Sequence, residues 1–206
     1  MGDRPNLYLA SRSPRRRELL QQIGVRFELL DIEVDEGQLP EEQPTDYVRR
    51  VAEEKAVAGF RQLSEAARLP VLAADTSVVV NGHILGKPEN RDHALWMLGQ
   101  LSDTTHEVFS AVTLCRSVPQ TSVSVSRVTI RKLSQAEMLG YWQTGEPLDK
   151  AGSYAIQGLG AQFIARLEGS YSAVMGLPLF ETAQLLQSGG IEFGAGKTNL
   201  IGPGSI

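Results

Sequence analysis

The sequence predicts an α/β protein, built as one well-cored domain or as two small lobes around a cleft. Its 206 residues suffice for a core of that size. Runs with the periodicity of strands are interspersed with runs of helical periodicity, and turn signals separate them. We expect one folded domain over residues 1–187 and a glycine-rich, flexible tail over residues 188–206, where periodicity is lost.

Composition restricts the functional classes. The chain has 20 Lys and Arg residues against 24 Asp and Glu residues, so we expect no nucleic-acid binding through overall charge, and any basic site must be local. The single cysteine, Cys115, allows neither an intrachain disulfide nor a CxxC metal-ligand set. The N-terminus lacks the apolar core of a signal peptide, and no apolar run approaches the ~20 residues that span a bilayer. We therefore expect a soluble cytoplasmic protein without a membrane partner.

The N-terminal segment predicts a strand, a loop and a helix. Leu7–Ala10 is a short apolar run, Ser13 is a suitable N-cap, Pro14 suits the first helical position, and Gly24 can end the helix in a left-handed conformation. Serines and arginines crowd the first turn: Ser11, Arg12, Ser13, Arg15, Arg16 and Arg17. Cations are unfavourable there unless an anion docks, because a helix N-terminus already carries partial positive charge. A polyphosphate is the natural ligand, and a solvated basic turn is the alternative.

An acidic loop over residues 31–42 comes next. Most of its carboxylates should face water, but a carboxylate beside the phosphate site is a suitable ligand for a divalent ion. The following helix, capped by Thr45 or Asp46 and ending near Gln62, carries Lys55 on its apolar face. That lysine either extends outward along its aliphatic stem or points its ammonium at a buried anion.

The most apolar strand candidate is Val71–Val80, which continues into the hairpin signal Asn81-Gly82 and a short return strand, His83–Leu85. Asp75 interrupts this otherwise apolar run. A buried carboxylate must be paired, hydrogen-bonded or bound to metal, so Asp75 is the strongest catalytic candidate in the chain. The alternative is an aspartate satisfied by neighbouring backbone amides.

The rest of the chain predicts strands at Val25–Leu30, His106–Cys115 and Thr121–Arg131, helices capped by Asn90 and Ser134, a hairpin of Gln162–Leu167 with Tyr171–Met175, and a helix over Leu179–Leu186. A phase slip between Val125 and Val128 predicts a bulge. The block Glu146–Gly160 is small, polar and glycine-rich, which predicts a ligand-contacting loop rather than core. Gly194–Thr198 ends like a Walker A loop, but Ile191 stands where that motif needs its first glycine, so we do not assign it.

Four motifs occur in an order that resembles the Maf family of nucleoside triphosphate pyrophosphatases: Ser11–Arg16, Ala74–Thr76, Gly86–Pro88 and Asp149–Gly152. The resemblance covers roughly residues 7–186. Two later segments, Tyr154–Gly158 and Gly176–Leu179, look like the family branch that acts on dTTP and UTP rather than the branch that acts on N7-methyl-GTP. Arg12 and Asp103 depart from the family pattern without removing a motif position.

The resemblance implies an elongated mixed β-sheet with flanking helices and two lobes around a central nucleotide-binding cleft, usually in a homodimer. It also implies hydrolysis of the α–β phosphoanhydride to a nucleoside monophosphate and pyrophosphate, with Mg²⁺ or Mn²⁺. The family's proton acceptor falls on Asp75, and positions linked to substrate choice fall on Arg15, Thr76 and Gln157. Other cleft positions fall on Ser11, Arg16, Glu36, Lys55 and Lys87.

The resulting hypothesis is a house-cleaning pyrophosphatase for dTTP, UTP and modified pyrimidine nucleotides. Four cationic side chains would bind the triphosphate, namely Arg15, Arg16, Lys55 and Lys87. The serines Ser11 and Ser13 would bind it as well. Glu36 would hold the metal, with Asp75 as a second candidate ligand, and Asp75 would orient and deprotonate the attacking water. A carboxylate that binds a metal tightly is a poor base, and the sequence does not decide between these two roles of Asp75. Two alternatives remain, namely cleavage of N7-methyl-GTP and a nucleotide-binding regulator of cell division without turnover.

Overall fold

The computed structural model describes residues 4–194. The strands are β1 (Leu7–Leu9), β2 (Phe27–Leu29), β3 (Val71–Val80), β4 (His83–Leu85), β5 (Thr104–Cys115), β6 (Pro119–Ile130) and β7 (Ile164–Glu168). The α-helices are α1 (Pro14–Gln22), α2 (Pro44–Gln62), α3 (Arg91–Leu101), α4 (Gln135–Gln143), α5 (Tyr171–Met175) and α6 (Leu179–Ser188). Short 3₁₀ helices are η1 (Glu65–Ala67), η2 (Glu146–Asp149), η3 (Ala151–Ser153) and η4 (Gly158–Phe163).

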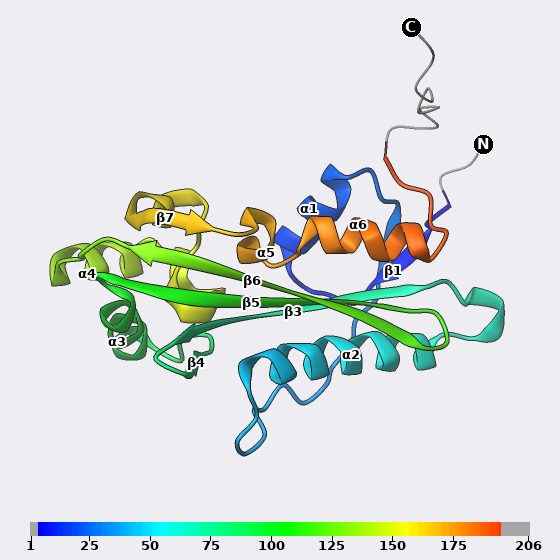
Figure 1. Cartoon of the computed structure of the whole chain (residues 1–206), viewed down its shortest axis with the longest axis horizontal. Helices are drawn as coiled ribbons and strands as arrows, with labels where there is room; N and C mark the ends of the chain where they lie inside the picture. Colours follow the sequence, from blue (N-terminus) through cyan, green and yellow to red (C-terminus); the bar gives the residue numbers. More distant parts are fainter. Residues whose placement is uncertain (1–3, 195–206) are drawn as a thin grey trace, which may run out of the picture.

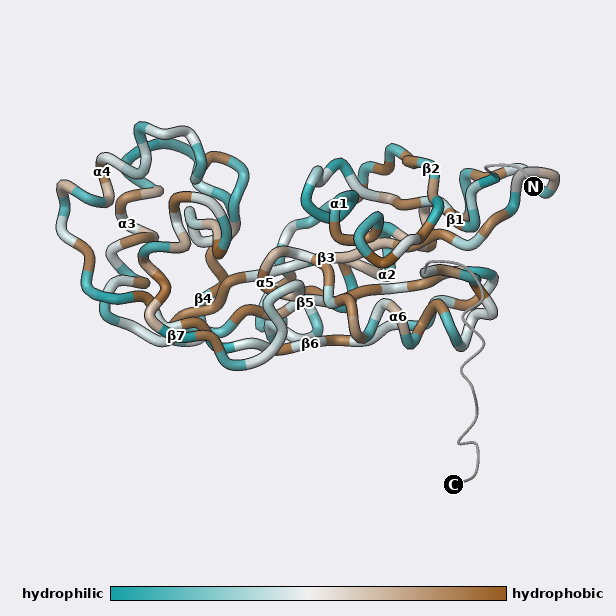
Figure 2. The backbone as a smooth tube through the Cα atoms, turned by 90° about the horizontal axis from the view of Figure 1, so that it is seen from above, coloured by the Kyte–Doolittle hydropathy of each residue, from teal (hydrophilic) through white to brown (hydrophobic). Residues whose placement is uncertain are grey.

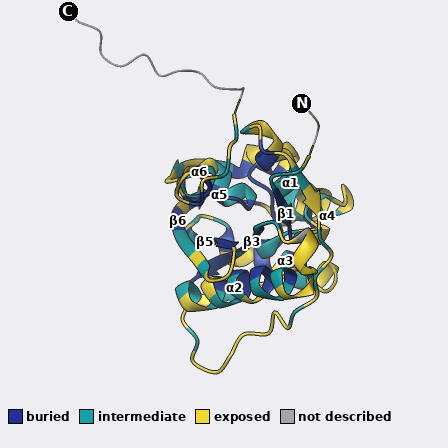
Figure 3. Cartoon of the chain, turned by 90° about the vertical axis from the view of Figure 1, so that its right-hand side faces the viewer, coloured by how far each residue is buried: buried dark blue, intermediate teal, exposed yellow. Residues whose placement is uncertain are grey.

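The strands form one open mixed sheet of 7 strands in the order β2-β1-β3-β5-β6-β7, with β4 paired to β3 (Figure 1). β1 runs parallel to β2 and β3, and the other neighbouring pairs are antiparallel. Helices α1, α5 and α6 cover one face of the sheet, and α2 covers the other (Figures 1 and 3). The predicted α/β class with an elongated mixed sheet is therefore confirmed.

Two lobes share the three long strands β3, β5 and β6. One end of the molecule carries β1, β2, α1 and α6, and the other carries β4, β7, α3 and α4 (Figure 2). Each end has its own apolar cluster, and on β3 the first cluster ends at Ala74 while the second begins at Val78. The strand is polar between them, from Asp75 to Ser77, and Thr76 pairs with Ser110 of β5. The polar residues of β3 therefore lie at the junction of two apolar cores.

Local signals in the sequence define most helix ends as expected. Gly24 has a φ of 72°, Asn90 accepts a hydrogen bond from the His93 amide, and Ser134 forms the predicted capping box. The predicted cap of α2 is wrong, because the helix begins at Pro44 with Gln43 as its N-cap residue. Proline suits this first position, since the amide hydrogen it lacks would have no helical partner.

The predicted bulge between Val125 and Val128 is also wrong. β6 pairs with β5 without interruption, and the register shift lies near Ile130 in the pairing with β7. Val125 faces solvent, whereas Ser126 is buried, and its hydroxyl accepts from the Ser170 amide at 3.0 Å. Side chains of β6 continue to alternate between the two faces of the sheet. The hydropathy pattern suggests a slip because a serine occupies a buried position and a valine occupies an exposed one.

The predicted hairpin that included Tyr171–Met175 is replaced by a strand, β7, followed by a short helix, α5. The Ser170 hydroxyl accepts a hydrogen bond from the Ala173 amide at 3.2 Å and so caps that helix. The helix returns the chain from β7 at one end of the molecule toward the middle of the sheet (Figure 1).

Residues 188–194, the start of the segment predicted as a flexible tail, lie against the first lobe. Ile191 and Phe193 pack against its apolar cluster, and the Gly194 amide donates to the Ile23 carbonyl at 2.9 Å. Residues 195–206 lie outside the described part of the chain, and with them most of the Gly194–Thr198 segment. Within residues 4–194, no helix is both long and apolar enough to cross a membrane.

His106 on β5 should make stability depend on pH. Its side chain is buried, and its Nε2 lies 2.7 Å from the Tyr154 hydroxyl. Burial lowers the pKa of His106 to about 4, whereas an unfolded histidine titrates near ~6.5. Stability is therefore full above about pH 6.5 and falls as the pH drops toward about 4, because over this window only the unfolded state binds the proton.

We expect His106→Gln to reduce this loss of unfolding free energy between about pH 6.5 and 4, in urea titrations at several pH values. His83→Gln, which changes an exposed histidine, should keep the wild-type profile. An unchanged profile in the His106 variant would contradict the assignment.

Candidate active site

The centre of the candidate site is a lysine between two carboxylates. Asp75, on β3, is 6% exposed, and its Oδ1 lies 3.0 Å from Nζ of Lys55 on α2. The same ammonium lies 2.9 Å from Oε1 of Glu36 in the acidic loop. Of the alternatives that the sequence left open, Lys55 thus points inward at a buried anion, and Asp75 is paired with a cation.

Helix packing explains why the lysine points inward. Val48 and Ala52 on α2 pack against Ala111 of β5, whose partner in β3 is Asp75. Residues one turn apart share a helix face, so Lys55 follows these side chains onto the sheet. The helix thereby brings an ammonium to the buried carboxylate on β3.

Cations surround Glu36 as well. Burial opposes the ionisation of Glu36, but Lys55, Lys87 and Arg16 together outweigh burial and lower its pKa. Tyr47, at the start of α2, donates its hydroxyl to the Glu36 carbonyl oxygen at 2.8 Å. Burial, then Asp75 and Glu36, raise the pKa of Tyr47 to about 12, so this hydroxyl keeps its proton at neutral pH.

Tyr47 joins the candidate site through this contact, although the sequence did not single it out. The available signal was spacing, since Tyr47, Val51 and Lys55 recur every four residues and so lie on one helix face.

A second cluster joins Arg16 of α1 to Thr76 beside the catalytic candidate. Arg16 Nε donates to the Gly176 carbonyl oxygen at 2.8 Å, and its Nη2 lies 3.5 Å from Thr76 Oγ1. Thr76 Oγ1 lies 3.0 Å from the Ser110 hydroxyl, which donates to the Ala173 carbonyl at 2.7 Å. Ser110 uses its proton on that carbonyl, so Thr76 must donate to Ser110 and can accept from Arg16.

Ser110 was also missed. Nothing in the sequence reveals it before the register pairs it with Thr76.

The beginning of α1 faces the same region. Ser13 occupies the predicted N-cap position, although among the described residues its hydroxyl makes no capping bond, and its amide donates to Ser11 Oγ at 3.2 Å. Burial lowers the pKa of the Arg15 guanidinium, which Asp149 partly opposes. Burial likewise lowers the pKa of Arg16 against the opposing charges of Asp75 and Glu36. Both guanidiniums are partly desolvated, which favours an incoming anion.

The other two arginines of this turn contact groups outside the Lys55 cluster. Arg12 pairs with Asp31 at 2.6 Å and with Glu33 at 2.9 Å, and all three side chains are largely exposed. Arg17 donates to the Arg12 carbonyl at 3.2 Å. Of the four arginines that crowd this turn, only Arg15 and Arg16 therefore keep guanidiniums that an anion could engage.

The second lobe contributes Lys87, exposed after β4, and Gln157, half-buried at the start of η4. The prediction that Glu146–Gly160 makes poor core is wrong for its middle part. Residues 152–156 are buried, and Tyr154 is a member of the apolar cluster of that lobe. The loop carrying Gln157 is therefore anchored in the core.

Two carboxylates converge on Lys55, and their oxygens are the ligands that Mg²⁺ and Mn²⁺ prefer. Residues 4–194 hold no group of three or more His, Cys, Asp or Glu side chains that could bind a metal alone. Mg²⁺ usually takes one or two carboxylates and completes its shell with water and phosphate oxygens, so Glu36 and Asp75 fit a metal that arrives with a nucleotide.

Two surface cavities lie away from these residues. One, of about 490 Å³, is lined by Arg68, Arg116 and neighbours at the end of β5, and the other, of about 370 Å³, lies between β4 and α3 beside Trp96. Neither contains a residue of the predicted site, so side-chain chemistry rather than cavity size locates it.

Removal of Lys55 should reveal how strongly the central ion pair is coupled. Lys55→Met keeps the aliphatic stem and leaves Asp75 buried without its cation, so we expect a loss of about 3–5 kcal/mol of unfolding free energy. Adding Asp75→Asn should restore part of this loss, because an amide carries no charge. Denaturant titrations of the two single variants and the double variant measure the coupling.

Arg12→Met breaks the exposed ion pairs and should change stability little. Strictly additive losses in the Lys55 and Asp75 variants would show that the two residues are not coupled.

Comparison with known proteins agrees with the predicted resemblance. The profile of the family described as Maf-like protein matches residues 6–189. A dTTP/UTP pyrophosphatase of Alkalilimnicola ehrlichii is 54% identical over 193 residues, which cover 92% of this chain and 96% of that protein. Proteins of the same name from Methylococcus capsulatus and Bordetella parapertussis are 54% and 52% identical, and cover 90% and 92% of this chain and 91% and 95% of their own lengths.

Among solved structures, the chain is similar to a nucleoside-triphosphatase / dITP/XTP pyrophosphatase of Mycobacterium abscessus, with a TM-score of 0.42, 16% identity, and coverage of 89% of this chain and 94% of that one. The family profile and the relatives, each spanning most of the chain, establish that this protein belongs to the Maf family.

Proposed function

We propose that this Maf protein hydrolyses dTTP and UTP, and modified pyrimidine nucleotides of the same form, to the nucleoside monophosphate and pyrophosphate. The observation that carries the proposal is a buried carboxylate, Asp75, set beside the cations Lys55 and Arg16 at the junction of the two lobes. The relatives named dTTP/UTP pyrophosphatase support this substrate choice over N7-methyl-GTP, and their names support turnover over simple nucleotide binding.

Triphosphate binding falls to groups from both lobes. The α1 N-terminus offers backbone N–H donors and the hydroxyls of Ser11 and Ser13, and Arg15 and Arg16 add guanidiniums that suit phosphate oxygens. Lys87 approaches from the second lobe as a point charge near Glu36. Such fixed cations stabilise the charge that develops on phosphoryl oxygens during transfer.

Asp75 is the group placed to orient the attacking water and accept its proton. The Lys55 ammonium lies 3.0 Å away and pairs with this carboxylate. Tyr47 and Lys55 together hold Glu36 toward Asp75. A divalent ion bound through Glu36 and Asp75 would supply charge neutralisation at the phosphates. A carboxylate that coordinates tightly is a weaker base, so Asp75 serves mainly one of the two roles.

Base choice falls to Gln157. A pyrimidine imide presents an N–H donor beside a carbonyl acceptor, and a carboxamide presents the complementary acceptor and donor. One glutamine can therefore bind uracil or thymine through two hydrogen bonds, whereas cytosine reverses part of that pattern.

We also infer that the protein is a homodimer, which rests on the family resemblance. The free thiol of the buried Cys115 supports a reducing compartment, the cytoplasm. Size-exclusion chromatography with light scattering tests the dimer, and a monomer at micromolar concentration would contradict it.

The first functional prediction concerns products and metal. With dTTP or UTP and Mg²⁺ or Mn²⁺, we expect the monophosphate and pyrophosphate in equal amounts, because attack at the α phosphorus cleaves the α–β bond. Product chromatography and a pyrophosphate-coupled assay measure this. Excess EDTA should abolish turnover. Release of the nucleoside diphosphate and orthophosphate, or full activity in EDTA, would contradict the proposal.

Asp75→Asn tests the general base. The change is nearly isosteric, and Lys55 retains Glu36 as a partner, so we expect an intact fold by circular dichroism. The rate should fall by about 10²–10⁴, the usual contribution of an aligned general base, while nucleotide binding by calorimetry changes less. Asp31→Asn, in the exposed pair with Arg12, is the control and should retain the wild-type rate. A wild-type kcat in the Asp75 variant would disprove its role.

Gln157→Ala tests base choice. We expect the wild-type enzyme to prefer dTTP and UTP over CTP and purine nucleotides. In the variant, the UTP-to-CTP ratio of kcat/KM should narrow by more than the rate on CTP falls, because the lost hydrogen bonds serve uracil and not cytosine. Gln162→Ala is the matched control, since Gln162 lies in η4, the 3₁₀ helix that Gln157 precedes, and its side chain donates to the Leu159 carbonyl of that same helix. Equal losses on every nucleotide would make Gln157 a structural residue.

A further inference from the structure

One carboxylate holds the segment that follows Gln157. Glu146, which begins η2, accepts hydrogen bonds from the Leu159 amide at 2.9 Å and from the Gly160 amide at 2.9 Å. It also accepts from the Tyr141 hydroxyl at 2.7 Å. Three donors from two chain segments therefore converge on the two oxygens of one side chain.

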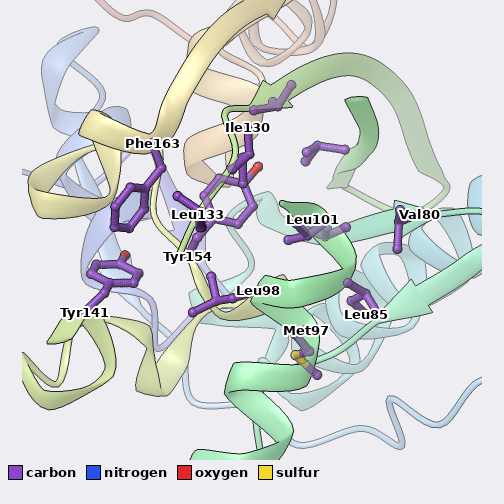
Figure 4. Close-up of a cluster of buried hydrophobic side chains, with 13 residues drawn as sticks. Val80, Leu85, Met97, Leu98, Leu101, Ile130, Leu133, Tyr141, Tyr154 and Phe163 are labelled. Carbon is purple, nitrogen blue, oxygen red and sulfur yellow. The ribbon is translucent and has the colours of Figure 1, made fainter. Parts of the chain in front are cut away.

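The segment that precedes Gln157 is tied to the same pair. The Ala155 amide donates to the Tyr141 hydroxyl oxygen at 3.1 Å. The Tyr141 ring is 3% exposed and packs edge-to-face on Phe163, with ring centroids 5.1 Å apart (Figure 4). Tyr141 is thus fixed in the core and, with Glu146, anchors the backbone on both sides of Gln157.

The glycines of the loop are required by this contact. A Cβ on Gly158 would lie 2.5 Å from Glu146 Oε2, and a Cβ on Gly160 would lie 2.3 Å from the Ala155 carbonyl oxygen and 2.6 Å from the Tyr141 hydroxyl. Gly158 also has a φ of 70°, which side-chain-bearing residues rarely adopt. The small residues that suggested close approach to a ligand instead allow close approach to Glu146.

Glu146 remains charged in this position. Burial opposes its ionisation, but the Leu159 and Gly160 amides and the Tyr141 hydroxyl outweigh burial and lower its pKa. An ionised carboxylate accepts all of these hydrogen bonds at once, whereas an amide of the same size cannot, because its nitrogen is a donor.

We propose that Glu146 is a positioning residue that sets base discrimination by fixing the Gln157 loop. The inference rests on the proposed role of Gln157 in reading a pyrimidine. Two hydrogen bonds to a base require the carboxamide to be held in a narrow range of positions, and misplacement of a binding group weakens recognition without altering distant chemistry. Glu146 acts through the loop and contacts neither Asp75 nor its lysine partner.

The test compares Glu146→Gln with two other variants. Glutamine keeps the volume but leaves one of the backbone amides without an acceptor, so we expect the UTP-to-CTP ratio of kcat/KM to fall about tenfold, as for the loss of one hydrogen bond. The change should appear mainly in KM for UTP, with kcat nearly retained. Amide hydrogen exchange over residues 155–160 should accelerate. Tyr141→Phe, which removes only the hydroxyl, should change the ratio and the exchange in the same direction.

Glu137→Gln is the matched control. Glu137 also accepts a backbone amide, that of Ser134 at 2.8 Å, and lies on the same helix as Tyr141. Its link to η4 is indirect, because it pairs with Arg131, which donates to the Gln162 carbonyl beyond the Leu159 and Gly160 amides that Glu146 holds. It should lose stability without a change in the UTP-to-CTP ratio. The inference would be overturned if Glu146→Gln, like Glu137→Gln, lost stability but kept the wild-type UTP-to-CTP ratio of kcat/KM. It would also be overturned if Tyr141→Phe accelerated amide exchange over residues 155–160 and yet kept the wild-type ratio. If the wild-type enzyme releases no pyrophosphate from UTP, the proposed function itself fails.

Discussion

The structure depends on placing one ammonium between two carboxylates at the junction of two apolar cores. Lys55 bonds both Asp75 and Glu36, and without it a buried negative charge would remain in the central strand. The fold supplies this cation from a helix packed directly on that strand. A buried ion pair of this kind adds little net stability, because desolvation offsets much of the attraction. Stability alone therefore does not explain why this pair lies in the middle of β3.

Local signals carried much of the fold. The capping box at Ser134, the Asn81-Gly82 turn and the asparagine cap of α3 depend on residues a few positions apart, and each was predictable. The errors arise where distant partners decide. Ser126 is buried because the Ser170 amide bonds to it, and the chain beyond Ser170 forms a helix instead of a return strand. Ser126 and Ser170 are 44 residues apart, so a local window of the sequence does not reveal their contact.

The candidate site shows the same division. A carboxylate inside an apolar strand identified Asp75 without any structure, because such a group needs a partner. The sequence left the direction of Lys55 open, since both orientations are compatible with helical spacing, and only packing on the sheet decides between them. Arg12 was grouped with the anion-binding arginines by proximity in the chain, yet acids 19 residues or more away engage it. Charge patterns thus indicate a site, and tertiary pairing selects its members.

The balance of charge at the candidate site differs from the balance over the whole chain. The chain carries a formal charge of −4, yet the candidate site combines four cationic side chains, Arg15, Arg16, Lys55 and Lys87, with two carboxylates. Burial removes part of the water from both guanidiniums before any ligand arrives, and this desolvation lowers the pKa of each arginine. An anion that reaches them restores lost electrostatic interactions and displaces little further solvent, which favours association. Acidic residues elsewhere, such as those held by Arg12, leave this local excess intact because the solvent screens them.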